Sequence, residues 1–314
     1  MNNMLNTFIK SHKGNALYIM ATATALGLMS IAILAIYAKL NRYQGRGFER
    51  RFIESFQITS VDTVMLEDAS QFYMAGRAKN TVYISSRKTP ARLVEFHLTT
   101  NDTTHRLLSI EHPVPLLINS IQVNVDSPNF YLSEGTVPVI YKGDLQEKVG
   151  RRIEHSLPYF TDFIFLSGNK GIIRSLSAKK NNILGIIDLK TGSVCFDHNI
   201  LVPQIDGIFC TAGLAQKTYP NGTAVYVYTY RNEFFVLDSG LSVTTRMNTI
   251  DTTTTAKIKV ATLRKGSSSN LSSPPTIVNR KVSALKNLVF IQSQMFSDNE
   301  TIGEKEYTPV DIYD

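Results

Sequence analysis

The side chains that could carry chemistry are few and scattered. The histidines outside the N-terminal segment lie far apart, and no two of them stand at metal-ligand spacing: His97, His105, His112, His155 and His198. Phosphate-binding, nucleophile-elbow, dinucleotide-binding and zinc-hydrolase motifs are absent from the sequence. We therefore predict no catalytic, cofactor-binding or metal-ligating residue and no cofactor, and we expect that the protein is not an enzyme.

Four aspartates stand at or beside the ends of short apolar runs: Asp188, Asp238, Asp311 and Asp314. An aspartate in such a place commonly accepts hydrogen bonds from backbone N–H groups of the adjoining turn. We expect this capping role for all four, in preference to acid–base catalysis.

Several aromatic residues occupy positions typical of strands: Tyr73, Tyr83, Tyr131 and Phe165. Such residues most often fill the core between sheets, and we expect them there. A role in lining a binding face is the alternative.

The only two cysteines are Cys195 and Cys210, which flank a turn-rich stretch. In an oxidising compartment they could pair, and closing a loop of that size is worth about 3 kcal/mol in the chain-entropy model. Two buried thiols in apolar runs are the simpler interpretation, and both possibilities stay open.

These residues must be positioned by a chain that begins with a tail, residues 1–15, and a membrane-type segment. Residues 16–38 contain no charged side chain. A helix of this length spans roughly 35 Å, enough to cross a hydrocarbon core of about 30 Å. The apolar part of a cleaved signal peptide usually covers only about 7–15 residues. We expect an uncleaved transmembrane helix in contact with lipid.

Positive charge is concentrated beside this segment. The net charge of the chain is +7; residues 1–55 contain seven Lys or Arg and two acids, and residues 56–314 contain 26 and 24. We expect residues 39–55 to form a basic, solvated juxtamembrane stalk that touches anionic head groups, and we expect no nucleic-acid partner.

The orientation of the span is ambiguous. The charges that follow it would keep the C-terminal side in the cytoplasm. However, long domains translocate largely regardless of charge, and a short tail before a single span is the usual arrangement of a signal anchor. We favour a single-pass protein of the inner (plasma) membrane with an extracytoplasmic domain.

Residues 56–314 show an all-β pattern. Runs rich in β-branched and aromatic residues predict strands at 81–85, 92–98, 162–166, 182–189, 223–229, 233–238 and 288–294. Turn residues such as Gly, Asn, Pro and Lys separate these runs.

One strand-and-turn unit recurs along this region. It ends at His97, Lys142, Asp188, Asp238 and Asp314, at intervals near 45–50 residues once a low-complexity stretch is set aside. That stretch, near residues 264–276, is expected to be a flexible insertion. The period predicts a β-propeller of about five four-stranded blades, with a β-sandwich as the alternative.

The uncharged segment, the Arg-rich stalk and the blade strands at 185–192 and 309–314 resemble bacterial six-bladed β-propeller proteins tethered to the cell envelope. The resemblance covers roughly residues 56–314 and implies the fold and an envelope location, but no catalytic residues. In that family the pattern at 309–314 continues into a further blade. We therefore expect a last blade left incomplete, with residues 58–66 as the candidate for closing it, and we favour an open arc over a closed ring.

Two functions fit this architecture. The first is a membrane-tethered binding or scaffolding module in the cell envelope, with a protein or peptide partner. The second is an envelope hydrolase or lyase whose site lies in the propeller funnel, where distant blades could also assemble a metal site.

Overall fold

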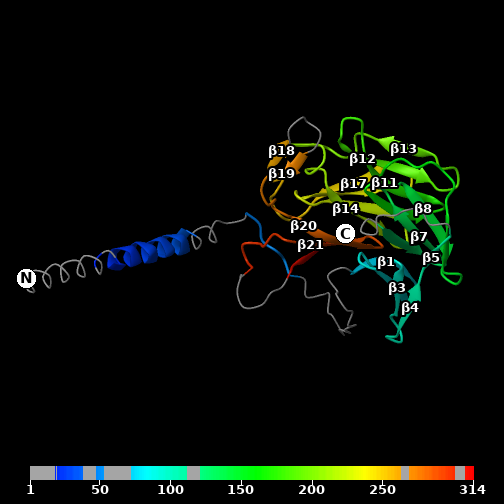
Figure 1. Cartoon of the computed structure of the whole chain (residues 1–314), viewed down its shortest axis with the longest axis horizontal. Coiled ribbons are helices and arrows are strands. Elements are labelled where there is room, and N and C mark those ends of the chain that lie inside the picture. Colours follow the sequence, from blue (N-terminus) through cyan, green and yellow to red (C-terminus); the bar gives the residue numbers. More distant parts are fainter. Residues whose placement is uncertain are drawn as a thin grey trace, which may run out of the picture. The chain divides into compact units, whose positions relative to one another are not determined.

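The computed structural model describes residues 18, 20–37, 47–52, 72–111, 121–262, 269–300 and 308–314. The chain divides into two units, Met1–Phe48 and Glu49–Asp314. The first unit contains a helix, Met20–Tyr37, that is long and apolar enough to cross a membrane (Figure 1). Its hydroxyl-bearing residues donate to carbonyl oxygens four positions earlier, Thr24 to Met20 and Ser30 to Leu26, which satisfies these polar groups within an apolar helix.

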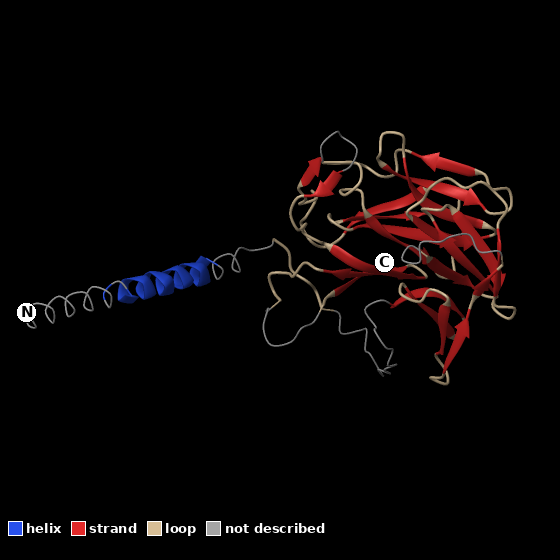
Figure 2. Ribbon diagram, viewed as in Figure 1, coloured by secondary structure: helices blue, strands red, loops and turns tan. Residues whose placement is uncertain are grey.

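The second unit consists of strands joined by turns (Figure 2). Blade 1 contains β1 (Phe72–Ala78), β2 (Thr81–Ser86), β3 (Arg92–His97) and β4 (Thr103–Leu107). Blade 2 contains β6 (Gln122–Asp126), β7 (Asn129–Glu134), β8 (Val139–Asp144) and β9 (Val149–Arg152), and β5 (Ser109–Ile110) pairs in parallel with β9.

Blades 3 and 4 also contain four strands each, and the described part of blade 5 contains three. Blade 3 contains β10 (Asp162–Ser167), β11 (Lys170–Leu176), β12 (Asn182–Asp188) and β13 (Val194–Asp197). Blade 4 contains β14 (Gly213–Thr218), β15 (Thr223–Tyr228), β16 (Glu233–Leu237) and β17 (Val243–Asn248). Blade 5 contains β20 (Asn279–Leu285), β21 (Leu288–Ser293) and β22 (Val310–Tyr313).

The prediction of an all-β propeller with about five blades is confirmed. Apart from the parallel strand β5, each sheet is an antiparallel meander in sequence order. The first strands of neighbouring blades contact one another around the axis, from β1 through β6, β10 and β14 to β20. The unit that recurs in the sequence is the third strand of each blade, namely β3, β8, β12, β16 and β22.

Apolar side chains join neighbouring blades into pairs. Separate hydrophobic clusters connect blades 1 and 2, 2 and 3, 3 and 4, and 4 and 5. Tyr131 of blade 2 stacks on Phe165 of blade 3 with ring centroids 4.2 Å apart. The core role predicted for Tyr131, Phe165 and Tyr83 is confirmed, and Tyr73 is partly buried against the first cluster. None of the clusters formed by the described residues connects blade 5 to blade 1.

Within the described residues β22 is the outer strand of blade 5, and the candidate closing segment 58–66 lies outside these residues.

The predicted insertion contains a strand. In it, β19 (Ser269–Leu271) pairs with β18 (Val260–Thr262), and Leu271 packs against the cluster around Cys210. The predicted insertion therefore includes a paired strand at Ser269–Leu271.

Buried tyrosines predict how the propeller responds to alkali. Burial raises the pKa of Tyr226 to about 12, although Arg174 opposes this, and the Tyr226 hydroxyl donates to the Thr211 carbonyl at 2.7 Å. An unfolded tyrosine ionises near pH 10, so the unfolded chain releases this proton first. The stabilisation is present below about pH 10 and is lost as the pH rises towards about 12.

Urea unfolding at a series of pH values measures this dependence. Stability should fall across that window in the wild type. The fall should be smaller in Tyr226→Phe, which keeps the ring and removes the titrating proton. An identical slope in both proteins would show that Tyr226 does not contribute.

Candidate functional site

Two of the four predicted aspartates cap turns as expected. Asp188 Oδ1 accepts hydrogen bonds from the backbone N–H groups of Lys190 and Thr191, at 2.8 and 3.2 Å. Asp238 Oδ1 accepts from Gly240 and Ser242, both at 2.8 Å. These carboxylates are occupied in shaping the turns after β12 and β16.

The prediction is wrong for Asp311, which forms an ion pair. Both of its carboxylate oxygens accept from Arg50, at 2.6 Å from Nε and 2.9 Å from Nη2. Arg50 lies 261 positions earlier, so no local pattern marks this partner. Asp314 is exposed, and no turn within the described residues uses it as a cap.

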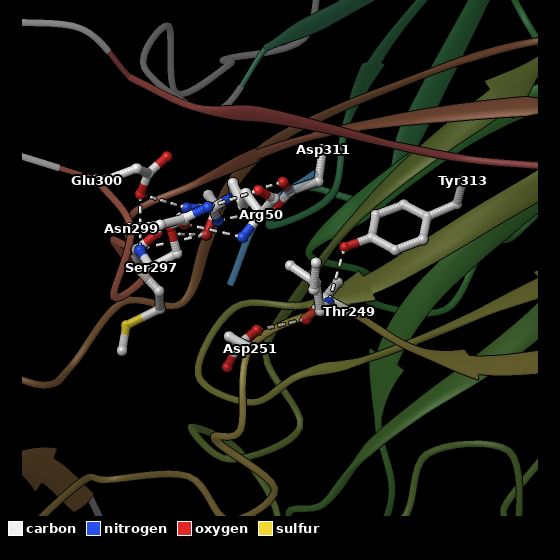
Figure 3. Close-up of polar contacts among 11 residues, drawn as sticks. Arg50, Thr249, Asp251, Ser297, Asn299, Glu300, Asp311 and Tyr313 are labelled. Carbon is white, nitrogen blue, oxygen red and sulfur yellow. Dashed lines mark hydrogen bonds and ion pairs between the residues drawn. The ribbon is translucent and has the colours of Figure 1, made fainter. Parts of the chain in front are cut away.

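Arg50 lies between two acidic residues of blade 5 (Figure 3). Besides Asp311, its Nη1 donates to Glu300 Oε2 at 2.7 Å and to the Met295 carbonyl at 2.8 Å. Its backbone is held as well, because Asn299 accepts from the Arg50 N–H at 3.0 Å and donates to the Arg50 carbonyl at 2.8 Å. We call Arg50, Met295, Asn299, Glu300 and Asp311 the Arg50 clasp.

The clasp is nearly closed to solvent. The side chains of Arg50, Glu300 and Asp311 are 6%, 0% and 11% exposed. Burial alone would lower the pKa of Arg50, but the hydrogen bonds and charges of Asp311 and Glu300 outweigh it and raise the pKa above its ordinary value. Arg50 therefore stays charged inside blade 5.

A second set of contacts holds the other end of β22. The Tyr313 hydroxyl accepts a hydrogen bond from the backbone N–H of Ile250 at 2.9 Å, and the neighbouring Thr249 donates to Asp251 at 2.6 Å (Figure 3). The last strand is thus bonded both to the Arg50 segment and to the loop that follows blade 4.

The clasp corrects the interpretation of the basic stalk. Arg50 is buried and paired, so it does not belong to a solvated stalk, whereas its neighbour Arg51 is exposed. The other cations of the stalk, Lys39, Arg42 and Arg46, lie outside the described residues. Nothing in the local sequence shows that Arg50 is buried and Arg51 exposed, because the acidic partners of Arg50 lie about 250 positions away.

The described histidines make separate contacts. His97 Nδ1 lies 3.2 Å from the Thr81 hydroxyl, and His155 Nε2 lies 2.9 Å from the Lys190 carbonyl. His105 and His198 are exposed, and His112 lies outside the described residues. No group of three metal-ligating side chains occurs in the part of the chain that the structure describes.

Both cysteines are free thiols, and no disulfide joins them. Cys210 is buried as expected, but Cys195 is exposed, so the buried interpretation is wrong for Cys195. Cys195 lines a cavity of about 320 Å³ between blades 3 and 4, together with Phe196, Leu241 and Arg246. Arg246 is already paired with Glu233 and donates to the Ile200 carbonyl at 3.0 Å.

Polar contacts between different blades lie at one end of the axis. The hairpins between the first and second strands of all five blades meet at this end, because every blade starts with an inner strand running the same way. Lys217 of blade 4 forms an ion pair with Asp126 of blade 2 at 2.7 Å, and it lies over the ring of Phe165 of blade 3. Side chains from blades 2, 3 and 4 thus contact one another at this end of the axis.

Tyr219 extends these contacts across the gap between blades 5 and 1. Its carbonyl accepts from the Lys286 N–H of blade 5 at 2.7 Å, and its hydroxyl accepts from the Lys79 N–H of blade 1 at 3.2 Å. The Arg77 guanidinium carbon lies 6.0 Å from the centre of the Tyr219 ring. One residue of blade 4 therefore joins the first and last blades where no hydrophobic cluster does.

Comparison with known proteins found matches among solved structures but none among family models or curated sequences. No family model matches the sequence, and no curated protein matches it. The structure of TolB from Acinetobacter baumannii matches 59% of this chain and 44% of its own length, at 15% identity and a TM-score of 0.38. A member of the duf4221 family from Bacteroides vulgatus matches 78% of this chain and 80% of its own, at 12% identity and 0.44.

A third similar structure is the hydrazine synthase of Kuenenia stuttgartiensis. It matches 74% of this chain and 59% of its own length, at 13% identity and a TM-score of 0.35. The chain thus spans less than half of the Acinetobacter structure and about three fifths of the Kuenenia structure.

Proposed function

We propose that this protein is a membrane-tethered propeller that acts as a binding or scaffolding module in the cell envelope. The helix Met20–Tyr37 anchors it in the inner membrane, and the propeller lies on the extracytoplasmic side. Its partner is a protein or peptide, and it catalyses no reaction.

The observation that carries this proposal is the Arg50 clasp. Residues 38–49 are the only chain between the apolar helix and Arg50, and twelve residues reach about 45 Å at most. Because Arg50 is fixed to β22 by charged hydrogen bonds, this short segment ends at a buried attachment point of blade 5. This arrangement suits a domain held at a membrane surface.

The hydrogen bonds and ion pairs of several carboxylates support a binding role. Asp188 and Asp238 are occupied by turn N–H groups, and Asp311 and Glu300 are neutralised by Arg50. Asp126 is paired with Lys217 at one end of the axis. These carboxylates are therefore not free for general acid–base chemistry, which needs a group that can reach a substrate.

Location can be tested with the native thiols. A membrane-impermeant maleimide added to intact spheroplasts should label the exposed Cys195 and leave the buried Cys210 unmodified. Cys195→Ser is the matched control and should remain unlabelled. Labelling that requires lysis would place the propeller in the cytoplasm and would favour the count of positive charges.

Binding can be tested in living cells with a photo-crosslinking amino acid. One set of full-length variants carries it in the inner hairpins, at Asn80 or Asn221. A second set carries it at the opposite end of the blades, at Tyr159 or Leu176, which are 42% and 36% exposed. A binding module should give a discrete adduct from one end, and absence of adducts from both ends would contradict the proposal.

A further inference from the structure

Positive side chains gather around Tyr219 at the end of the axis where the first hairpins of the blades lie. Arg77 and Lys79 come from the first hairpin of blade 1, and Lys286 comes from the corresponding hairpin of blade 5. Their hairpins are held to the same tyrosine by the bonds from Lys79 and Lys286 to Tyr219. Lys79 and Lys286 are exposed, so their ammonium groups are accessible from solvent.

None of these three cations forms an ion pair with the described residues. The other cation of this end, Lys217, is neutralised by Asp126. Arg77 is partly buried, and its Nε is buried without a hydrogen-bond partner. A guanidinium that is partly removed from water and lacks an acceptor is an unusual arrangement, since charged groups normally find a partner when they are buried.

The surrounding charges restrict what can approach. The hairpins between the third and fourth strands lie at the same end but farther from the axis. They carry more acidic than basic side chains, namely Asp102, Asp144, Glu147, Asp188 and Asp238 against Lys148 and Lys190. A broad anionic surface such as a bilayer would meet these acids, whereas a narrow anionic segment reaches the central cations alone.

We propose that Arg77, Lys79 and Lys286 form a binding site for an acidic polypeptide segment of the partner protein. This inference rests on the proposed binding role and identifies the surface that performs it. Carboxylates of the segment accept hydrogen bonds from the Arg77 guanidinium and pair with the two lysines. The exposed amides of Asn80 and Asn287 lie next to the lysines in sequence and offer further donors to the segment.

The test uses the full-length protein in a neutral detergent and a fluorescent hexaglutamate peptide, followed by anisotropy. Lys79 and Lys286 have φ of +44° and +55°, a region that asparagine tolerates, so Lys79→Asn with Lys286→Asn removes both charges and suits the turns. We expect this double variant to bind at least about tenfold more weakly than the wild type.

The matched control makes the same two Lys→Asn substitutions at turns outside the proposed site. Lys148 and Lys180 are exposed turn lysines with φ of +62° and +60°, outside the central hairpins. Lys148→Asn with Lys180→Asn removes the same charge and should bind the peptide as the wild type does. Equal weakening by both double variants would overturn the site, because it would show only a general charge effect.

A second measurement avoids dependence on variant folding. The photo-crosslinking residue at Asn80 should capture the hexaglutamate peptide in the otherwise unchanged protein, and the same residue at Tyr159 should not. Absence of peptide binding, or binding of pyrophosphate or anionic vesicles in its place, would overturn the proposal. A cellular adduct formed only from the Tyr159 end would also overturn it and would leave the binding function standing.

Discussion

Replacing Arg50 with alanine is expected to lower the free energy of unfolding of the propeller by about 3–5 kcal/mol, the usual cost of removing one partner from a buried ion pair. The substitution leaves the carboxylates of Asp311 and Glu300 buried without their counter-ion. It also removes the hydrogen bond to the Met295 carbonyl. The loss should be greatest in blade 5, since β22 carries Asp311.

Urea unfolding of the full-length chain in detergent measures this loss, and hydrogen exchange shows whether β21 and β22 become more accessible. Arg51→Ala is the matched control, because Arg51 is the exposed neighbour in sequence and should change stability by less than about 0.5 kcal/mol. If the two variants unfolded at the same urea concentration, the clasp would not stabilise the fold.

Replacing Leu28 with arginine is expected to release a large fraction of the protein from the membrane. Leu28 lies near the middle of the helix Met20–Tyr37, where an arginine costs about 2.5–3.5 kcal/mol of insertion free energy. After alkaline carbonate extraction, the wild type should remain in the membrane pellet. The variant should be found partly in the supernatant or degraded.

Leu28→Ala is the control for this experiment, because it shortens the side chain without adding charge and should stay in the pellet. Release of an intact wild-type chain by carbonate would contradict integral insertion. A shortened wild-type chain that lacks its first residues would instead identify the helix as part of a cleaved signal sequence.

Strands and repeats could be predicted from the sequence because their signals are local. The predicted run at 92–98 differs by one residue from the strand Arg92–His97, and the run at 182–189 differs by one from Asn182–Asp188. The repeated unit was recognisable because the third strand of blades 1 to 4 pairs with a strand on each side and is rich in apolar residues. The apolar helix could also be predicted, because its signal is an uninterrupted run of uncharged residues.

The capping roles of Asp188 and Asp238 were also predictable, since a cap and its turn lie within four residues of each other. Asp311 lies in the last recurring strand and was expected to be a cap as well, yet it pairs with Arg50. The local pattern was the same, and the difference came from a partner far away in the chain.

The sequence by itself determined the positions of several strands, the blade period, the apolar segment and two of the turn caps, because each depends on residues close together in the chain. Only the tertiary structure decided that Arg50 is buried and Arg51 exposed, that Cys195 faces solvent, and that Arg77, Lys79 and Lys286 surround Tyr219. The contacts of Arg50 with Asp311 and of Lys79 with Tyr219 join segments separated by 100 residues or more. The tertiary arrangement of the blades brings such segments together, and no pattern within a single blade records which of them will touch.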